Sequence, residues 1–213
     1  MPGVGFTMPQ YPNLSLEIPL WQSGLVSLAG LDEAGRGAWA GPVSAGAVVL
    51  PVDAELCQQL PGVRDSKQMT ALQRSYWAER IKMIAVSWGV GFASQAEIDA
   101  NGIVPATRLA MQRALEQLSV NPEHLLIDAL RLPLVKIPQT ALIKGDVHSL
   151  TIAAASVLAK SSRDALMIEL DALYPGYGFA HHKGYGTRLH QQALRHLGAC
   201  PIHRISFSPL KNL

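Results

Sequence analysis

The sequence predicts a three-layer α/β domain with a mixed central sheet flanked by helices, followed by a small helical C-terminal segment. Its 213 residues are close to the upper limit of one ordinary domain. Apolar residues make up 48% of the chain and charged residues 16%, which is typical of a folded globular protein and excludes a disordered one. Segments with strand character come first, and strands and helices then alternate, which is the order of a layered α/β fold.

The first half of the chain shows strand and helix signals after an irregular start. Residues 1–24 contain four prolines and little hydrophobic periodicity, so we expect a loose N-terminal arm. Thr70 and Gln73 have the spacing of a capping box, which predicts the beginning of a helix. The elements predicted here are strands over 25–31 and 43–50, a helix over 70–84 and a strand over 86–92.

The second half alternates in the same way. Ser94 and Glu97 predict another helix start, and apolar residues at helical spacing predict the helices that follow. The predicted elements are a helix over 107–118, strands over 124–127 and 139–143, a long helix over 152–173 and a helix over 187–197. We therefore expect a main domain over 25–173, with 174–213 forming a C-terminal loop and helix.

Positive charge is concentrated near the C-terminus, although the net charge is only +2. No Asp or Glu follows Asp171, and this stretch holds five of the seven histidines. It also holds five basic residues, Lys183, Arg188, Arg195, Arg204 and Lys211. Such a stretch is either a surface that contacts phosphates or a basic face exposed to solvent.

The sequence lacks the signals of membrane insertion and secretion. No apolar run approaches the roughly 18 residues that a membrane helix needs. No Lys or Arg precedes Arg36, and the first residues contain no continuous apolar stretch, so no secretory signal is expected. Cys57 and Cys200 have no paired spacing, which predicts a reducing compartment and no zinc site. We expect a cytoplasmic protein.

Acidic residues follow three of the predicted strands. Asp32 and Glu33 come after the first, Asp128 after the strand over 124–127, and Asp146 after the strand over 139–143. Ligands of α/β sheets gather where strands end, so these acids are expected to converge. Asp32 and Glu33 would point to opposite faces of a regular strand, but the following Ala-Gly allows the chain to bend. An isolated Asp-Glu pair can also merely begin a turn.

Four converging carboxylates would repel one another, and two divalent cations would neutralise them. Oxygen ligands favour Mg²⁺ or Mn²⁺ over zinc. Two such ions about 3.5–4 Å apart are the usual apparatus of phosphodiester hydrolysis. The acids therefore suggest a metal-dependent nuclease.

These motifs together resemble the ribonuclease HII family. The resemblance covers about residues 26–209, with every motif in the family's order. The matching segments are Asp32–Gly37 with Gly41–Pro42, Asp65–Lys67, the strand ending in Asp128, Lys144–Asp146, the helix over 152–160 with Arg163–Asp164, and His182–Thr187.

The resemblance implies an RNase H-like fold and a role for each of these motifs. The implied catalytic and metal-binding residues are Asp32, Glu33, Asp128 and Asp146. Gly35, Arg36 and Gly37 would grip the ribose 2′-hydroxyl, the group that distinguishes RNA from DNA. Tyr185 would pack against the sugar of the deoxynucleotide beyond the cut. Without the family, Tyr185 would be interpreted as an ordinary loop aromatic.

Several further residues have a weaker assignment. Lys67 resembles a phosphate-contacting position, and Lys160 and Lys183 are candidates of the same kind, but each could equally be a solvated lysine. For His181 and His182 we expect a surface role, and for the run 153–155 tight helix packing. The chain departs from the family at Ala129-Leu130, where many members have Gly-Asn, and at Val147-His148. Both departures concern loop geometry and remove no ligand.

The activity that the resemblance implies is hydrolysis on the 5′ side of a ribonucleotide, leaving a 5′-phosphate and a 3′-hydroxyl. The implied substrates are RNA–DNA hybrids and DNA that contains ribonucleotides, the implied role is ribonucleotide excision repair, and we expect a monomer. One alternative is a non-catalytic hybrid-binding module on the same fold. Another is a nucleotide-binding enzyme that uses the Gly-rich turn after the first predicted strand, although this turn lacks dinucleotide or P-loop spacing.

Overall fold

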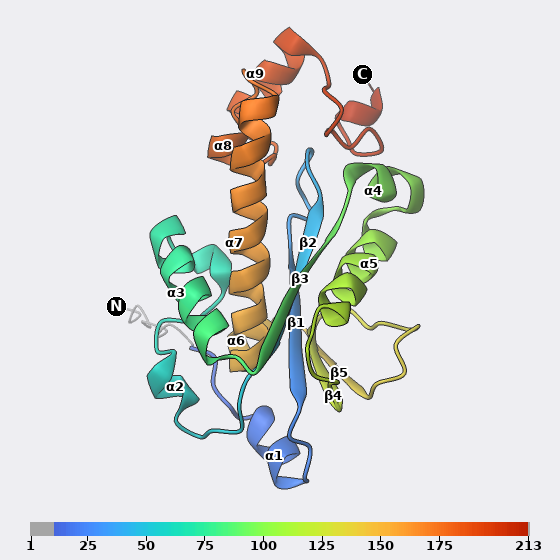
Figure 1. Cartoon of the computed structure of the whole chain (residues 1–213). Helices are drawn as coiled ribbons and strands as arrows, with labels where there is room; N and C mark the ends of the chain where they lie inside the picture. The colour runs from blue at the N-terminus through green and yellow to red at the C-terminus, as the bar shows by residue number, and fades with distance from the viewer. Residues whose placement is uncertain (1–10, 213) are drawn as a thin grey trace, which may run out of the picture.

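The computed structural model, shown in Figure 1, describes residues 11–212 and has a mixed sheet at its centre. The strands are β1 (Leu28–Ala34), β2 (Val43–Val49), β3 (Ser87–Ala93), β4 (His124–Asp128) and β5 (Gln139–Leu142). Their order is β3-β2-β1-β4-β5. The pairs β1–β2 and β2–β3 are antiparallel, whereas β1–β4 and β4–β5 are parallel. The predicted mixed sheet is confirmed.

Helices cover both faces of this sheet. The long helix α7 packs on β1 and β2 and is flanked by α3, while α5 packs on β2 and β3 from the other side (Figure 1). The helices are α1 (Glu17–Gln22), α2 (Leu56–Gln59), α3 (Ala71–Ile84), α4 (Gln95–Asn101), α5 (Ile103–Glu116), α6 (Gly145–His148), α7 (Leu150–Leu173), α8 (Phe179–His182) and α9 (Arg188–Leu197), with short 3₁₀ turns at Ser66–Gln68 and Leu210–Asn212. The three predicted layers are therefore present.

Side-chain caps explain where two of these helices begin. Thr70 and Gln73 form the predicted capping box at the start of α3, and Ser94 and Glu97 form the one that starts α4. Helix α5 already begins at Ile103, four residues before the predicted helix, because Gly102 separates it from α4. Periodicity alone gave no signal for this earlier beginning.

Small residues let α7 approach the sheet closely. Ala153, Ala154 and Ala155 are all 0% exposed, in agreement with the packing role expected for them. A Cβ at Gly46 on β2 would overlap the backbone carbonyl of Ala155, and one at Gly30 on β1 would overlap the backbone of α7. Glycine at these strand positions therefore allows α7 to lie directly on the sheet.

Residues 11–24 differ from the loose arm that we expected, while residues 1–10 lie outside the described part. Leu14 belongs to the hydrophobic core, and Glu17 on α1 is completely buried. The Glu17 carboxylate accepts hydrogen bonds from Ser149 Oγ (2.6 Å) and Thr151 N (3.0 Å) at the beginning of α7. A carboxylate at a helix N-terminus is stabilised by unpaired N–H groups and the helix dipole. Its partners are more than 130 residues away, so local sequence patterns did not show this contact.

The C-terminal segment folds back on the loop that follows β1. A separate cluster of buried apolar side chains joins the end of α7 to α8, α9 and the C-terminus; it consists of Ala40, Met167, Tyr177, Phe179, Leu194, Ile202 and Leu210. Across the described residues, every helix is too short or too polar to cross a membrane.

Candidate active site

The four predicted acids lie near the same end of the sheet. Strand β1 continues through Ala34, so Asp32 and Glu33 belong to the strand and do not follow it as expected. Leu31 pairs with Ile127 in the parallel β1–β4 ladder, which places Asp32 beside Asp128. Because Asp32 and Asp128 lie beside each other on parallel strands, these two acids converge, as their positions at strand ends predicted.

Asp146 reaches the site from the short helix α6. Lys144 adopts a left-handed conformation (φ 58°) and turns the chain after β5. The N–H of Gly145 then donates to Asp128 Oδ1 at 2.7 Å. Asp146 is thus tied to the end of β4 through its neighbour, although it lies on a helix.

Burial and nearby negative charges make Asp32, Glu33 and Asp146 difficult to ionise. Burial raises the pKa of Asp32 well above its usual range, and the charges of Glu33 and Asp128 raise it further. Burial, with Asp65 and Asp128 nearby, raises the pKa of Asp146 to about 6. Burial also raises the pKa of Glu33, although Arg36 opposes this. The protein alone does not neutralise this negative charge.

Unpaired carboxylate oxygens indicate which kind of ligand this site would bind. Asp32 Oδ2 and Glu33 Oε2 are buried and have no hydrogen-bond partner among the described residues. Oxygen-only donors of this kind suit hard divalent cations. Within residues 11–212, no three Asp, Glu, His or Cys side chains are already arranged to hold one ion. The chemistry of the donors therefore fits divalent cations.

A cavity of about 450 Å³ lies next to Glu33 and contains most of the predicted substrate-binding residues. Its lining residues are Glu33, Ala34, Gly35, Arg36, Gly37, Ser66, Lys67, Arg74, Lys160 and Tyr185. Lys183 lines a second cavity of about 440 Å³, which shares Tyr185, Lys160 and Arg74 with the first. The Lys183 ammonium group donates to the carbonyl of Ala180. Tyr185 thus lies between the two cavities.

The glycines of the Gly35–Gly37 loop have different structural settings. Gly35 has a φ of +91°, and a Cβ there would overlap the side chain of Arg163. Gly37 faces open space, because a Cβ added there would meet no atom within 4 Å beyond its chain neighbours. Between them, Arg36 Nη1 pairs with Glu33 Oε1 at 3.1 Å. Glycine is therefore needed at 35 by the fold itself, while the backbone of Gly37 is open to a ligand.

The two lysines that line the first cavity are both tied to acidic groups. Burial alone would lower the pKa of Lys67, but Asp32 and other nearby acids raise it above its usual value. Lys160 Nζ bonds Asp164 Oδ1 at 2.6 Å and lies 5.4 Å from the centre of the Tyr185 ring. Lys160 is therefore held in place and is not a solvated lysine.

Some residues at the site had no predicted role. Asp65 belongs to a matched motif, and its charge acts on both Asp146 and Lys67. Arg74 lines both cavities and pairs with Asp164 at 3.0 Å. The motif match could have indicated Asp65, but Arg74 lies on a helix whose sequence gives no sign of a binding role.

The surface role expected for His182 is wrong, whereas His181 is exposed as expected. His182 is 8% exposed and stacks on His190, with ring centres 4.5 Å apart. His190 Nε2 lies 2.9 Å from His203 Nε2, and its Nδ1 lies 3.1 Å from the carbonyl of Tyr185. These buried histidines support the loop that carries Tyr185.

Acid should destabilise the protein through this histidine cluster. Burial lowers the pKa of His190 to about 4, whereas an unfolded chain has a His pKa of about 6.5. The unfolded state therefore binds a proton that the folded state excludes, and stability falls as the pH drops from about 6.5 towards 4. In melting curves at pH 7.5, 6.0 and 5.0, His190→Gln should show a shallower fall than the wild type. The exposed His196→Gln should behave like the wild type, and equal slopes for all three would contradict the assignment.

Comparison with known proteins agrees with this architecture. The family model for ribonuclease HII matches residues 29–210. The chain is 54% identical over 195 residues to the ribonuclease HII of Desulfitobacterium hafniense (strain Y51), an alignment that covers 92% of this chain and 74% of the relative. The crystal structure of ribonuclease H2 from Pyrococcus horikoshii OT3 has a TM-score of 0.72 and 25% identity, covering 87% of this chain and 96% of that one.

A more distant structure shares the fold. Bst-RNase HIII, solved in complex with Mn²⁺, has a TM-score of 0.64 and 20% identity over 87% of this chain and 68% of that one. The family match and the 54% identical relative both extend over most of the chain. The chain therefore belongs to the ribonuclease HII family of endoribonucleases, as its motifs predicted.

Proposed function

We propose that this enzyme cuts the RNA strand of RNA–DNA hybrids and cuts DNA on the 5′ side of an embedded ribonucleotide, leaving a 5′-phosphate and a 3′-hydroxyl. The observation that carries this proposal is the position of the uncompensated acids beside a cavity lined by Gly35–Gly37. Family membership and the ribonuclease name of its relatives support the same interpretation. Removal of ribonucleotides from DNA is the expected role.

Two divalent cations, Mg²⁺ or Mn²⁺, are the proposed cofactors. Asp32, Glu33, Asp128 and Asp146 would hold them. The Mn²⁺ complex of the structural relative supports this choice of ion. When bound, the ions would supply an activated water and neutralise charge on the leaving oxygen. The unpaired oxygens of Asp32 and Glu33 support the assignment.

The remaining residues of the two cavities would bind the nucleic acid. Gly35, Arg36 and Gly37 are proposed to contact the ribose, and Tyr185 the sugar on the other side of the cut. Lys67, Lys160 and Lys183 would add positive charge along the phosphate backbone. We expect the enzyme to act as a monomer in the cytoplasm, and the free cysteines Cys57 and Cys200 support a reducing compartment.

One cleavage assay tests this function. The purified chain is incubated with three end-labelled duplexes of the same sequence: all DNA, DNA with one ribonucleotide, and an RNA–DNA hybrid. With Mg²⁺ or Mn²⁺ we expect cutting of the second and third duplexes only, with a 5′-phosphate at the new end. Without divalent ions no duplex should be cut. Binding to the hybrid without cutting under any of these conditions would instead support a non-catalytic binding module.

A further inference from the structure

Two arginines are completely buried beneath the loop formed by residues 35–42. Arg163 lies on α7 and Arg204 in the C-terminal segment, and both are 0% exposed. Among the described residues neither guanidinium pairs with a carboxylate, and all six side-chain hydrogen bonds of the two arginines go to backbone carbonyls. Burial, with Arg163 nearby, lowers the pKa of Arg204 to about 9, so its guanidinium stays charged at neutral pH. Burying two cations lowers the stability of the fold, so we expect these arginines to serve a purpose other than stability.

Arg204 fixes the orientation of the peptide groups in the Gly35–Gly37 loop. Its Nη2 donates to the carbonyl of Gly35 and its Nη1 to that of Arg36, both at 2.8 Å, while Nε donates to the carbonyl of Gly41. In a trans peptide the N–H of the next residue points away from the carbonyl. The N–H groups of Arg36 and Gly37 therefore face the side of the loop opposite Arg204. Within residues 11–212 neither N–H has a hydrogen-bond acceptor.

Arg163 joins the same loop to the segment that carries Tyr185. Its guanidinium donates to the carbonyls of Ala40 (3.0 Å) and Lys183 (2.8 Å), and its Nε donates to that of Pro42. It also lies 5.6 Å from the centre of the Tyr185 ring, within the range of a cation–π contact. One planar side chain thus fixes the distance between two loops that are about 140 residues apart in the chain.

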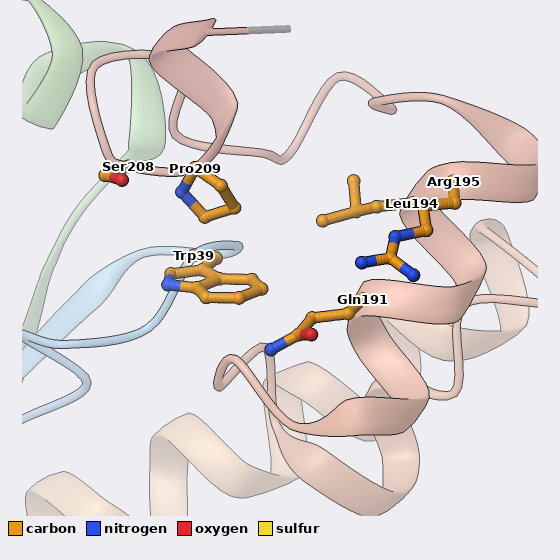
Figure 2. A pocket seen from close by; sticks show the side chains of 6 residues that line it. All are labelled: Trp39, Gln191, Leu194, Arg195, Ser208 and Pro209. Carbon is orange, nitrogen blue, oxygen red and sulfur yellow. The ribbon is translucent and has the colours of Figure 1, made fainter.

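Backbone hydrogen bonds also join the C-terminal segment to the loop formed by residues 35–42. Arg204 N donates to the carbonyl of Trp39, and Gly41 N donates to that of Ile202, both at 2.8 Å. Figure 2 shows Trp39 facing Pro209 of this segment across a cavity of about 400 Å³, with α9 beside it. The loop is therefore enclosed between α7, α9 and the C-terminal segment.

We propose that Arg163 and Arg204 are positioning residues for ribonucleotide recognition. Arg204 orients the peptide groups of the Gly35–Gly37 loop so that two N–H groups face the ribose. Arg163 keeps Tyr185 at a fixed distance from this loop. Neither side chain touches the nucleic acid. The inference rests on the proposed function, since it assigns the supports of that same site.

Arginine-to-lysine variants distinguish the effect of holding the loop carbonyls in place from the effect of positive charge. Lysine keeps the positive charge but lacks the planar fork that holds several carbonyls in fixed positions. The measurement is the binding, without divalent ions, of two duplexes that differ only in one 2′-hydroxyl. A hydrogen bond to this group should give the wild type a preference of about three- to tenfold. In Arg204→Lys the preference should fall towards one while affinity for the all-DNA duplex stays the same, and in Arg163→Lys it should fall partly.

Arg113→Lys is the matched control. Arg113 donates to the carbonyl of Phe92 (2.7 Å) and pairs with Glu97, on the opposite face of the sheet. Its replacement should lower the melting temperature without changing the 2′-hydroxyl preference. A merely structural role for Arg204 would give this same result.

Two outcomes are decisive and distinguishable. If the wild type has no 2′-hydroxyl preference and cuts no ribonucleotide duplex, the proposed function fails and this inference fails with it. If the wild type has the preference and folded Arg204→Lys retains it, only the positioning role is overturned. Should Arg204→Lys fail to fold, Phe207→Leu loosens the same guanidinium, which lies 5.2 Å from the Phe207 ring. An unchanged preference in folded Phe207→Leu and Arg163→Lys would overturn the role equally.

Discussion

Asp128→Asn is expected to slow cleavage by at least about a hundredfold while leaving the fold intact. Even partners that only orient metal ligands typically contribute about 10–100-fold to affinity or activity, so loss of a direct ligand should cost more. The asparagine can keep its Oδ1 as acceptor for Gly145 N, a bond of 2.7 Å that ties β4 to α6. Only the second oxygen is replaced, by an amide NH₂ group that cannot bind a cation, and the negative charge is lost.

The same change should not lower stability in the absence of metal. The Asp128 charge raises the pKa of Asp32 and of Asp146, so its removal relieves repulsion. We expect an unchanged or higher melting temperature and unchanged hybrid binding in metal-free buffer. Single-turnover cleavage across a Mg²⁺ titration measures the catalytic loss.

Asp53→Asn is a suitable control for this experiment. Asp53 also accepts a bond from a backbone N–H, that of Glu55 at 2.8 Å, but it lies on an exposed turn. Its variant should cut like the wild type. A near wild-type rate for Asp128→Asn at saturating Mg²⁺ would show that Asp128 is not a metal ligand.

The layers and the acid positions could be predicted because both depend on local patterns. Alternating strand and helix signals give the mixed sheet, and acids at strand ends give the convergence of Asp32 with Asp128. What failed depends on tertiary contacts that local patterns do not show, whether the partner is distant in the chain, as for Glu17, or only eight residues away, as for His182. Glu17 is buried by the beginning of α7, and His182 is buried by His190. Residue type alone suggests exposure for such groups, because burial of polar groups is decided by tertiary hydrogen bonds.

Ala129, where the chain departs from the family, adopts a backbone conformation that is unusual for alanine. Ala129 has a φ of 56°, in the left-handed region that glycine adopts more easily. Its N–H bonds the carbonyl of Leu142 at 2.7 Å, and Leu130 N bonds that of Asp128 at 2.6 Å. Backbone hydrogen bonds on both sides of Ala129 therefore hold the turn after Asp128 in this conformation. The sequence raised this position as a question of loop geometry, but only the backbone hydrogen bonds show how the turn is maintained.

Tyr185→Ala is expected to slow cutting at an isolated ribonucleotide in DNA by on the order of a hundredfold, which is what a displacement of about 1 Å can cost. The ring lies between two cavities, beside Lys160 and Arg163. A sugar packed on this ring would align the scissile phosphate with the carboxylates. A continuous hybrid offers many equivalent cutting positions, so we expect a smaller loss there.

The backbone around Tyr185 is held independently of its ring, which makes this variant a clean test. Its N–H donates to the carbonyl of His182 (2.9 Å), and its own carbonyl accepts from Thr187 N (2.8 Å) and lies near His190 Nδ1. Removing the ring should therefore leave the loop in place and the melting temperature nearly unchanged. Tyr185→Phe keeps the aromatic face, and we expect it to cut like the wild type. If Tyr185→Ala instead melts much earlier but turns over at the normal rate, the ring serves packing and does not sense the junction. Equal losses on both substrates would assign it to general binding, because only a contact specific to the junction discriminates between them.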